Sequence, residues 1–134
     1  MYIKNSGKRT KKHLELAKQM ALQSSYGKFQ HGAVLVRGNR VINASFNKDR
    51  FNSFGTRFRE RSCGHATHHA ELGCIVGLDR SITSGATIYV VRINAEGKFR
   101  MSKPCKMCHE VLKHCGVKKV VYTINEKEIA SYRL

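Results

Sequence analysis

Two short stretches of the sequence carry residue types that bind zinc, namely His69-Ala70-Glu71 and Pro104-Cys105-Lys106-Met107-Cys108. One histidine and two cysteines supply three ligands, and the fourth tetrahedral position then remains for water, as in catalytic zinc sites. A glutamate two residues after the histidine can transfer protons without binding the metal. The pattern therefore predicts one catalytic Zn²⁺ per chain, with Glu71 as the catalytic residue and with three metal ligands: His69, Cys105 and Cys108.

The order of these motifs, H-x-E followed by P-C-x-x-C, is typical of zinc deaminases that act on nucleobases. Zinc lowers the pKa of its bound water towards ~7, so that hydroxide is available at neutral pH. We expect Glu71 to take up a proton as hydroxide attacks the ring, and then to deliver protons to the ring nitrogen and the departing amine. The predicted products are ammonia and a base that carries a carbonyl in place of its amine.

A closed structural zinc site is the alternative interpretation of the same motifs. Cys63, His65 or His68 could provide a fourth ligand, and the chain would then be a basic, zinc-stabilised nucleic-acid-binding module without catalysis. These three residues could also form a second metal site of their own. The glutamate after His69 and the proline before Cys105 favour the catalytic interpretation, because a structural site requires neither.

Length and composition indicate a single deaminase domain over residues 1–134, since 41% of the residues are hydrophobic and 25% are charged. No apolar run approaches the roughly 18 residues that cross a membrane, and the lysine-rich N-terminus lacks the apolar core of a signal peptide. The five cysteines are an odd number, which favours a reducing compartment over a disulfide framework. We therefore expect a cytoplasmic protein with no membrane partner.

The sequence is strongly basic, with 25 lysines and arginines against 9 acidic residues and a net charge of +16. Such an excess favours a polyanionic partner, because each cation placed against a phosphate releases condensed counterions. The alternative is a solvated basic surface without a dedicated partner. A phosphorylated small substrate needs only one or two cations and does not account for the whole excess.

Basic and aromatic residues alternate within residues 48–67, a stretch without periodicity that predicts a long loop. Guanidinium groups suit phosphates and aromatic rings stack on unpaired bases, so the loop is a candidate binding segment for single-stranded nucleic acid. Alternatively, the phenylalanines pack beneath the loop as a small satellite core. The candidate nucleic-acid or phosphate contacts are Arg50, Arg57, Arg59, Arg61, Phe54 and Phe58.

Periodicity predicts alternating strands and helices, and hence an α/β fold in which helices cover a sheet. Both metal-binding motifs fall at expected helix starts, where the helix dipole would lower the pKa of Cys105 and Cys108, and Pro104 suits the first helical position. The expected helices span residues 9–23, 66–78 and 104–115, the expected strands span 31–37, 40–46, 86–93 and 117–124, and a short final helix is expected within 125–134.

On these motifs the sequence resembles the cytidine and deoxycytidylate deaminase superfamily, which includes tRNA adenosine deaminases and polynucleotide cytosine deaminases. The resemblance extends from Gly32 to Thr123 and also rests on Gly32-Ala33-Val34-Leu35-Val36 and on Asn47. It implies a three-layer α-β-α sandwich around a central mixed sheet of about five strands, and assembly into a homo-oligomer. It further implies that Asn47 hydrogen-bonds the sugar of the substrate and that the backbone around Ala70 meets the base.

The substrate that the resemblance implies is cytosine in a nucleotide or nucleoside of the dCMP or cytidine type, converted to uracil. The alternative is the same chemistry on a nucleic acid, either cytosine in single-stranded DNA or RNA, or adenosine in tRNA, with the target base unpaired or flipped out. The long segment before His69 is a feature that the sequence shares with the deoxycytidylate deaminases. The methionine of the P-C-x-M-C arrangement, here Met107, is shared with the tRNA adenosine deaminases. Lys103 departs from both groups.

Overall fold

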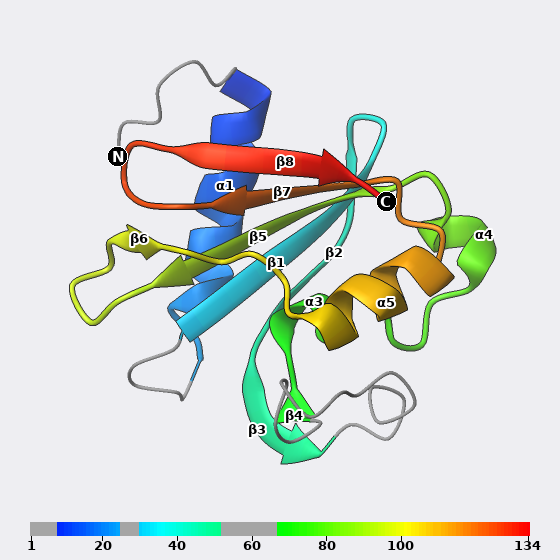
Figure 1. Ribbon diagram of the computed structural model, residues 1–134, viewed down its shortest axis with the longest axis horizontal. Helices are drawn as coiled ribbons and strands as arrows, with labels where there is room; N and C mark the ends of the chain where they lie inside the picture. The colour runs from blue at the N-terminus through cyan, green and yellow to red at the C-terminus, as the bar shows by residue number, and fades with distance from the viewer. Residues whose placement is uncertain (1–7, 25–29, 52–66) are drawn as a thin grey trace.

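A mixed β-sheet forms the centre of the computed structural model, which describes residues 8–24, 30–51 and 67–134 (Figure 1). Its strands follow the order β2-β1-β5-β7-β8, with β6 paired to β5, and β5 and β7 run parallel while the other pairs are antiparallel. The elements are α1 (Lys8–Ala21), β1 (Gln30–Arg37), β2 (Arg40–Phe46), β3 (Lys48–Phe51), β4 (Thr67–His68), α3 (Ala70–Ile75), α4 (Arg80–Thr83), β5 (Thr87–Ile93), β6 (Phe99–Arg100), α5 (Lys106–His114), β7 (Lys119–Thr123) and β8 (Ile129–Arg133).

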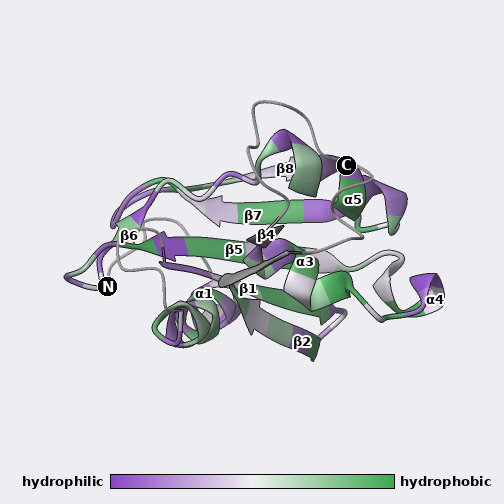
Figure 2. Ribbon diagram, turned by 90° about the horizontal axis from the view of Figure 1, so that it is seen from below, coloured by the Kyte–Doolittle hydropathy of each residue, from purple (hydrophilic) through white to green (hydrophobic). Residues whose placement is uncertain are grey.

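Helices cover both faces of the central sheet (Figure 2), so its inner strands β1 and β5 are largely buried on two sides. Alternate residues of β1 serve the two layers, because successive side chains of a strand point to opposite faces. Val34 packs in the cluster of α1, whereas Leu35 packs in the cluster of α3 and α5. The predicted three-layer α-β-α sandwich is therefore confirmed, with six strands in the main sheet of the described residues.

The helix α1 approaches β1 so closely that Gly32 has no room for a side chain. A Cβ atom built on Gly32 would lie 1.9 Å from the carbonyl oxygen of Ala17 and 2.7 Å from the amide nitrogen of Ala21. The helix contributes small residues to this contact, because Ala17 and Ala21 are both fully buried and their short side chains let the helix lie close to the strand. This contact fixes how α1 lies across the sheet.

The prediction of a short C-terminal helix is wrong. Residues 129–133 form β8, which pairs antiparallel with β7 and extends the sheet by one strand. Asn125 shapes the turn between the two strands, because its Oδ1 accepts hydrogen bonds from the N–H groups of Lys127 (2.8 Å) and Glu128 (2.9 Å). The edge of β7 offers backbone hydrogen-bond partners to the tail. The residue pattern of the ten-residue tail does not predict this pairing, because the partner strand comes from another part of the fold.

The segment before the first metal-binding motif also differs from the expectation. The helix expected over residues 66–78 begins only at Ala70 and ends at Ile75, and residues 67–68 form the strand β4 instead. This strand pairs with β3, so both ends of the predicted loop are extended and adjacent. Within the part of the chain that the structure describes, no helix combines the length and apolar character that crossing a membrane requires.

Candidate metal centre

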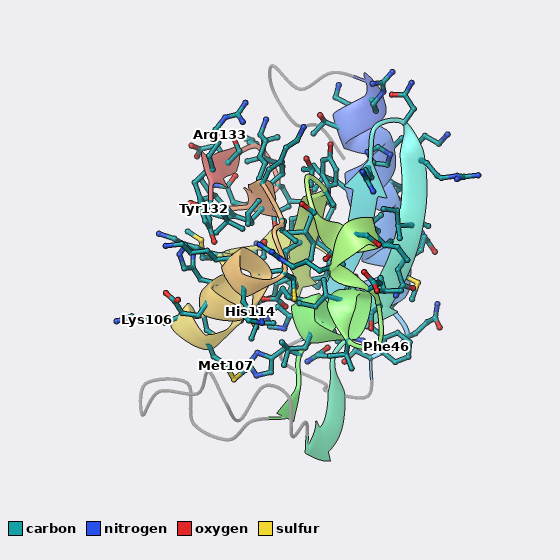
Figure 3. All side chains as sticks on the ribbon, turned by 90° about the vertical axis from the view of Figure 1, so that its right-hand side faces the viewer. Phe46, Lys106, Met107, His114, Tyr132 and Arg133 are labelled. Carbon is teal, nitrogen blue, oxygen red and sulfur yellow. The ribbon has the colours of Figure 1, made fainter. Side chains whose placement is uncertain are left out.

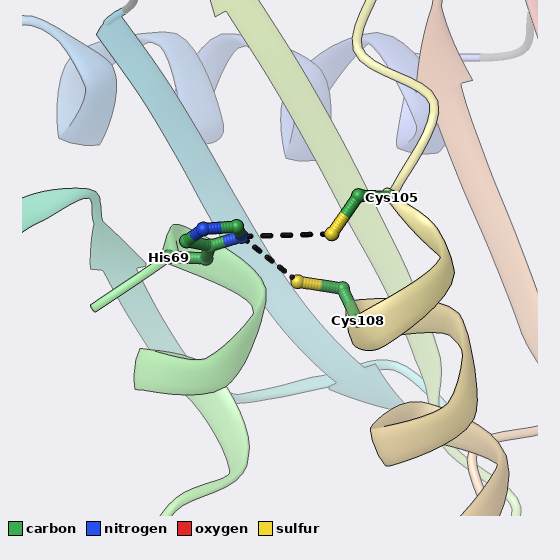
Figure 4. Close-up of side chains that lie close together, drawn as sticks. All are labelled: His69, Cys105 and Cys108. Carbon is green, nitrogen blue, oxygen red and sulfur yellow. Dashed lines mark hydrogen bonds between the residues drawn. The ribbon is translucent and has the colours of Figure 1, made fainter. Parts of the chain in front are cut away.

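The three side chains predicted as metal ligands lie together between the starts of α3 and α5 (Figure 4). His69 is the N-cap residue of α3, Cys105 is the N-cap residue of α5, and Cys108 lies in the first turn of α5. Both helices pack against the same face of the sheet through one apolar cluster. The fold thereby brings two distant sequence motifs to one point.

The spacing of the three ligand atoms fits a tetrahedral zinc ion. The Nδ1 atom of His69 lies 3.2 Å from the Sγ atom of Cys108 and 3.8 Å from the Sγ atom of Cys105. All three atoms fall within 4.8 Å of one another. Zinc–nitrogen and zinc–sulfur bonds at the tetrahedral angle place nitrogen and sulfur roughly 3.6 Å apart, so this donor set can hold zinc with little movement.

Glu71 lies two residues after His69, and it is buried with only 5% of its surface exposed. It lies in the first turn of α3, where the positive end of the helix dipole favours an anion. Its side chain is a hydrogen-bonding neighbour of the Cys108 thiol. A carboxylate that is both buried and beside a ligand is placed to exchange protons with a group bound at the centre.

The two thiols differ in acidity, which corrects the expectation that both helix starts lower the cysteine pKa. The pKa of Cys105 lies far below its ordinary value, because the Cys108 thiol donates a hydrogen bond to its sulfur and because His69 lies beside it. The pKa of Cys108 is raised by that same hydrogen bond, by burial and by the charge of Glu71. The environment therefore favours the thiolate at Cys105 and the protonated thiol at Cys108.

His69 gains protons more readily than an isolated histidine. Burial opposes its charged form, but the hydrogen bond to Cys105 and the negative charges of Glu71 and Cys105 outweigh burial and raise its pKa. Metal binding must displace this proton, because a histidine coordinates through its neutral imidazole.

The start of α5 is set two residues later than expected. The helix begins at Lys106, so Pro104 precedes the N-cap and does not occupy the first helical position. Cys105 has extended backbone angles (φ −67°, ψ 167°), and its side chain makes no capping hydrogen bond. Its sulfur is instead directed towards His69 (Figure 4).

Two buried hydroxyl groups anchor the chain just before this motif, and the sequence analysis missed both. Ser102 Oγ donates to the carbonyl of Val90 (2.8 Å) and accepts from the N–H group of Thr123 (2.8 Å), while Thr123 Oγ1 donates to the carbonyl of Arg100 (2.8 Å). The segment before Cys105 is thus tied to both β5 and β7. Only pairing across the sheet reveals these contacts, because neither residue belongs to a motif.

The side chain of Asn47, predicted to bind substrate, is held at the end of β2. Its Oδ1 accepts a hydrogen bond from the backbone N–H of His31 (2.9 Å), and its own carbonyl accepts one from the hydroxyl of Ser24 (3.1 Å). Asn47 is buried, so its amide is held in one orientation. Ala70, the second predicted substrate contact, is the fully buried first residue of α3.

Tyr132 on β8 is a further residue near the centre that the sequence analysis missed. Burial raises its pKa to about 12, and the negative charges of Glu71, Cys108 and Cys105 add to this effect. The tyrosine ring also stacks on His109 of α5, with 5.7 Å between the ring centroids. The tail was expected to be helical, so no signal in the sequence placed this ring beside α5.

Most of the candidate nucleic-acid contacts lie outside the described residues. Arg50 and His68 belong to β3 and β4, for which only the backbone is described. The remaining members of the basic loop and of the alternative ligand set lie within residues 52–66: Phe54, Arg57, Phe58, Arg59, Arg61, Cys63 and His65.

Comparison with known proteins identifies a matching family and similar folds. A profile of the cytidine and deoxycytidylate deaminase zinc-binding region matches residues 8–124 of the chain. The fold is similar to that of cytidine deaminase from Burkholderia pseudomallei, with a TM-score of 0.62 and 21% identity over 92% of this chain and 91% of that one. It is also similar to dCMP deaminase from the cyanophage S-TIM5, with a TM-score of 0.58 and 18% identity over 92% of this chain and 86% of that one.

A third similar structure is RibD from Acinetobacter baumannii, with a TM-score of 0.56 and 21% identity. The match covers 87% of this chain but only 28% of the RibD chain. No curated protein sequence matches this chain significantly. At these identities, the similarity to solved structures shows the fold alone.

Proposed function

The chain belongs to the cytidine and deoxycytidylate deaminase family, and on this basis we propose that it is a zinc-dependent hydrolytic deaminase that converts cytosine to uracil in a nucleotide. The observation that carries this proposal is the cluster of one imidazole nitrogen and two sulfur atoms beside a buried carboxylate. His69, Cys105 and Cys108 would hold the zinc ion, and Glu71 is the proposed catalytic residue.

The proposed reaction consumes water and releases ammonia. Bound zinc supplies Lewis acidity that makes water nucleophilic near neutral pH. Glu71 accepts one proton from the attacking water and passes it to the ring nitrogen as the oxygen bonds to the amine-bearing carbon. It then moves a proton from the new hydroxyl group to the amine, which leaves as ammonia while a carbonyl forms. Burial keeps this carboxylate away from bulk water during both transfers.

The proposed substrate contacts use groups that the fold holds in place. The backbone at Ala70 lies next to His69 and is assigned to the base, and the Asn47 amide is assigned to a hydroxyl group of the sugar. The hydrogen bond from the His31 N–H to Asn47 Oδ1 supports this role, because it fixes which way the amide faces. The Nδ2 atom of Asn47 is the proposed donor to the sugar.

Cytosine in a small substrate is supported by two of the similar structures, which are a cytidine deaminase and a dCMP deaminase. The second candidate is the same reaction on a base within a nucleic acid. The net charge of +16 favours that candidate, because one nucleotide does not require so many cations.

The experiment that tests the proposal is an ammonia-release assay on dCMP, deoxycytidine, single-stranded DNA and tRNA. Glu71→Gln serves as the blank, because it keeps the size of the side chain but cannot accept the proton. We expect turnover of at least one monomeric cytosine substrate, and a loss of about 10²- to 10⁴-fold in Glu71→Gln with zinc retained. Turnover of polymers alone would support the second candidate, and no turnover of any of the four would contradict both.

A further inference from the structure

A pocket of about 410 Å³ lies beside the proposed metal centre, between the start of α5 and the strands β7 and β8. Its volume falls within the range of small-molecule sites, roughly 300–1,000 Å³. Pro104 and Lys106, which flank the ligand Cys105, both line it. Among the residues that the structure describes, the lining consists of Lys103, Pro104, Lys106, His109, Tyr122 and Tyr132.

The aromatic wall of this pocket is a packed unit. The rings of Tyr122 and Tyr132 meet edge to face, with 6.0 Å between their centroids. Tyr132 also stacks on His109, and its hydroxyl oxygen lies 3.5 Å from His109 Nδ1. These three side chains come from β7, β8 and α5, so the wall exists only because the tail forms a strand.

The charge at the pocket is positive. Lys103 and Lys106 are exposed, and none of the described residues that line the pocket is acidic. The ammonium group of Lys103 lies 5.8 Å from the centre of the Tyr132 ring, within the range of a cation–π contact. Figure 3 shows Lys106 and Tyr132 on the same side of the molecule, one from α5 and the other from β8. A cationic ligand is therefore disfavoured, and an anionic one is favoured.

We propose that this pocket binds a phosphate group of the substrate, with Lys103 and Lys106 as the phosphate contacts and Tyr132 as the ring that positions Lys103. The inference rests on the proposed function, because the phosphate belongs to the molecule whose base reaches the metal centre. Phosphate is the anion that nucleotides carry, and two lysines match the one or two cations that it requires. The N-terminal end of α5, which begins at Lys106, carries the positive end of the helix dipole and therefore also favours an anion.

The proximity of the pocket to the reacting groups supports its use by the substrate and not by an unrelated ligand. Pro104 and Lys106 both line the pocket and flank Cys105 in the sequence, so the pocket begins next to one of the proposed metal ligands. Lys103 immediately precedes the proline of the metal-binding motif, so the cation and the ligand Cys105 are positioned by the same segment. A phosphate held there would remain close to the base.

The test compares phosphorylated and unphosphorylated substrates in matched variants. The double variant Lys103→Gln/Lys106→Gln removes both cations, and Lys113→Gln/Lys118→Gln removes two exposed lysines that do not line the pocket. We expect kcat/KM for dCMP to fall by about tenfold to a hundredfold in the first variant, as for lost charge-assisted hydrogen bonds. We expect kcat/KM for deoxycytidine, and both substrates in the control variant, to change by less than about twofold.

A single-stranded oligonucleotide distinguishes the two sources of phosphate. If the pocket binds a phosphodiester of a strand, the pocket variant should lower the slope of log affinity against log salt by about 1.4, which is ~0.7 for each lost contact. An effect on dCMP alone would identify the phosphate of a mononucleotide, and an effect on the oligonucleotide alone would identify a strand. Equal effects of the pocket variant and the control variant on every substrate would overturn the proposal.

Binding to the inactive Glu71→Gln protein separates this inference from the proposed function. We expect dCMP to bind Glu71→Gln more tightly than deoxycytidine does, and this preference to disappear when Lys103 and Lys106 are also replaced. A lysine-dependent preference without turnover by the native chain would contradict the deaminase proposal but support the phosphate site. Turnover with equal affinity for both molecules would contradict the phosphate site alone.

Discussion

The two faces of the sheet bury different kinds of side chain. On one face, α1 packs through Leu14, Ala17 and Ala21, and its backbone approaches Gly32 closely. On the other face, α3 and α5 also bury an apolar cluster, but at their N-terminal ends they gather an imidazole, two thiols and a buried carboxylate. The α1 face depends on close packing of apolar side chains. The α3–α5 face also packs apolar side chains, but it buries polar groups whose burial is unfavourable by itself.

Buried polar groups that no stabilising contact explains are the candidates for a chemical role. Burying a carboxylate costs folding free energy unless charges or hydrogen bonds compensate it. Glu71 is buried beside the Cys108 thiol and near His69, and among the described residues no lysine or arginine forms an ion pair with it, so stability explains its position poorly. Substitutions should therefore separate function on one face from stability on the other.

The largest effect is expected from removing a metal ligand on the α3–α5 face. Cys105→Ala leaves two ligands, and we expect loss of bound zinc and a fall in turnover of at least about 10³-fold, because metal catalysis contributes several kcal/mol. Cys115→Ser, at the other end of α5, is the matched control and should keep zinc and activity. Elemental analysis and the ammonia assay measure both. Zinc retained at one ion per chain in Cys105→Ala would contradict the ligand assignment.

On the α1 face, Gly32→Ala should reduce stability while leaving the metal centre of the folded protein intact. The added methyl group meets the Ala17 carbonyl, so the helix or the strand must shift, and we expect a loss of about 3 kcal/mol in the free energy of unfolding. Gly38→Asn is the control, because Gly38 lies in an open turn at φ +63°, which asparagine tolerates. Urea denaturation measures both variants, and equal losses would show that α1 packs less closely than described.

Thr123→Val tests the anchor between the sheet and the metal-binding segment. The variant keeps the shape of the side chain but removes the hydroxyl that donates to Arg100 and contacts Ser102. We expect a loss of about 1–2 kcal/mol in stability and a weaker affinity for zinc, since the segment before Cys105 loses a tie. Thr87→Val, on the half-buried start of β5, should change stability by less than about 0.5 kcal/mol. Unchanged zinc affinity would limit the role of Thr123 to stability.

The smallest effect concerns His13, a buried histidine on α1. Burial lowers its pKa below the ordinary 6.5, and the charges of Lys12 and Arg9 add to this effect. Because the unfolded chain then binds the proton more tightly, His13 should destabilise the fold as the pH falls through 6.5. Replacing it in His13→Phe should flatten the decline in stability between pH 7.5 and 5.5. Thermal unfolding across that range measures it, and parallel curves for the two proteins would exclude the contribution.

Much of the fold could be predicted from local pattern. The apolar run in β1 and the turn at Gly38-Asn39 identified the first hairpin, which the structure shows as β1 and β2. The helical spacing of Leu14, Ala17 and Ala21 identified α1. These predictions succeeded because each depends on periodicity within a few turns or residues, and because the buried face is continuous.

The predictions that failed depend on partners distant in the sequence. The tail was expected to be helical, but β7 offers an open edge and the tail pairs with it. The helix that contains Cys74 was expected to begin earlier, but Thr67 and His68 pair with β3 instead. A short segment with weak intrinsic preference takes the conformation that satisfies its backbone hydrogen bonds, and only the assembled sheet decides which one that is.

The sequence by itself determined the chemistry of the proposed centre, because the types and spacing of His69, Glu71, Cys105 and Cys108 already indicate three metal ligands and a proton-transferring group. The tertiary structure alone decided what surrounds that centre. It joined two motifs through α3 and α5, gave the two thiols different acidities, and placed Tyr132 beside the lysines of α5 and its preceding segment. The type of each residue determines which atoms can bind a metal. The distances between those atoms, their burial and the electric field around them arise only when separate segments pack together.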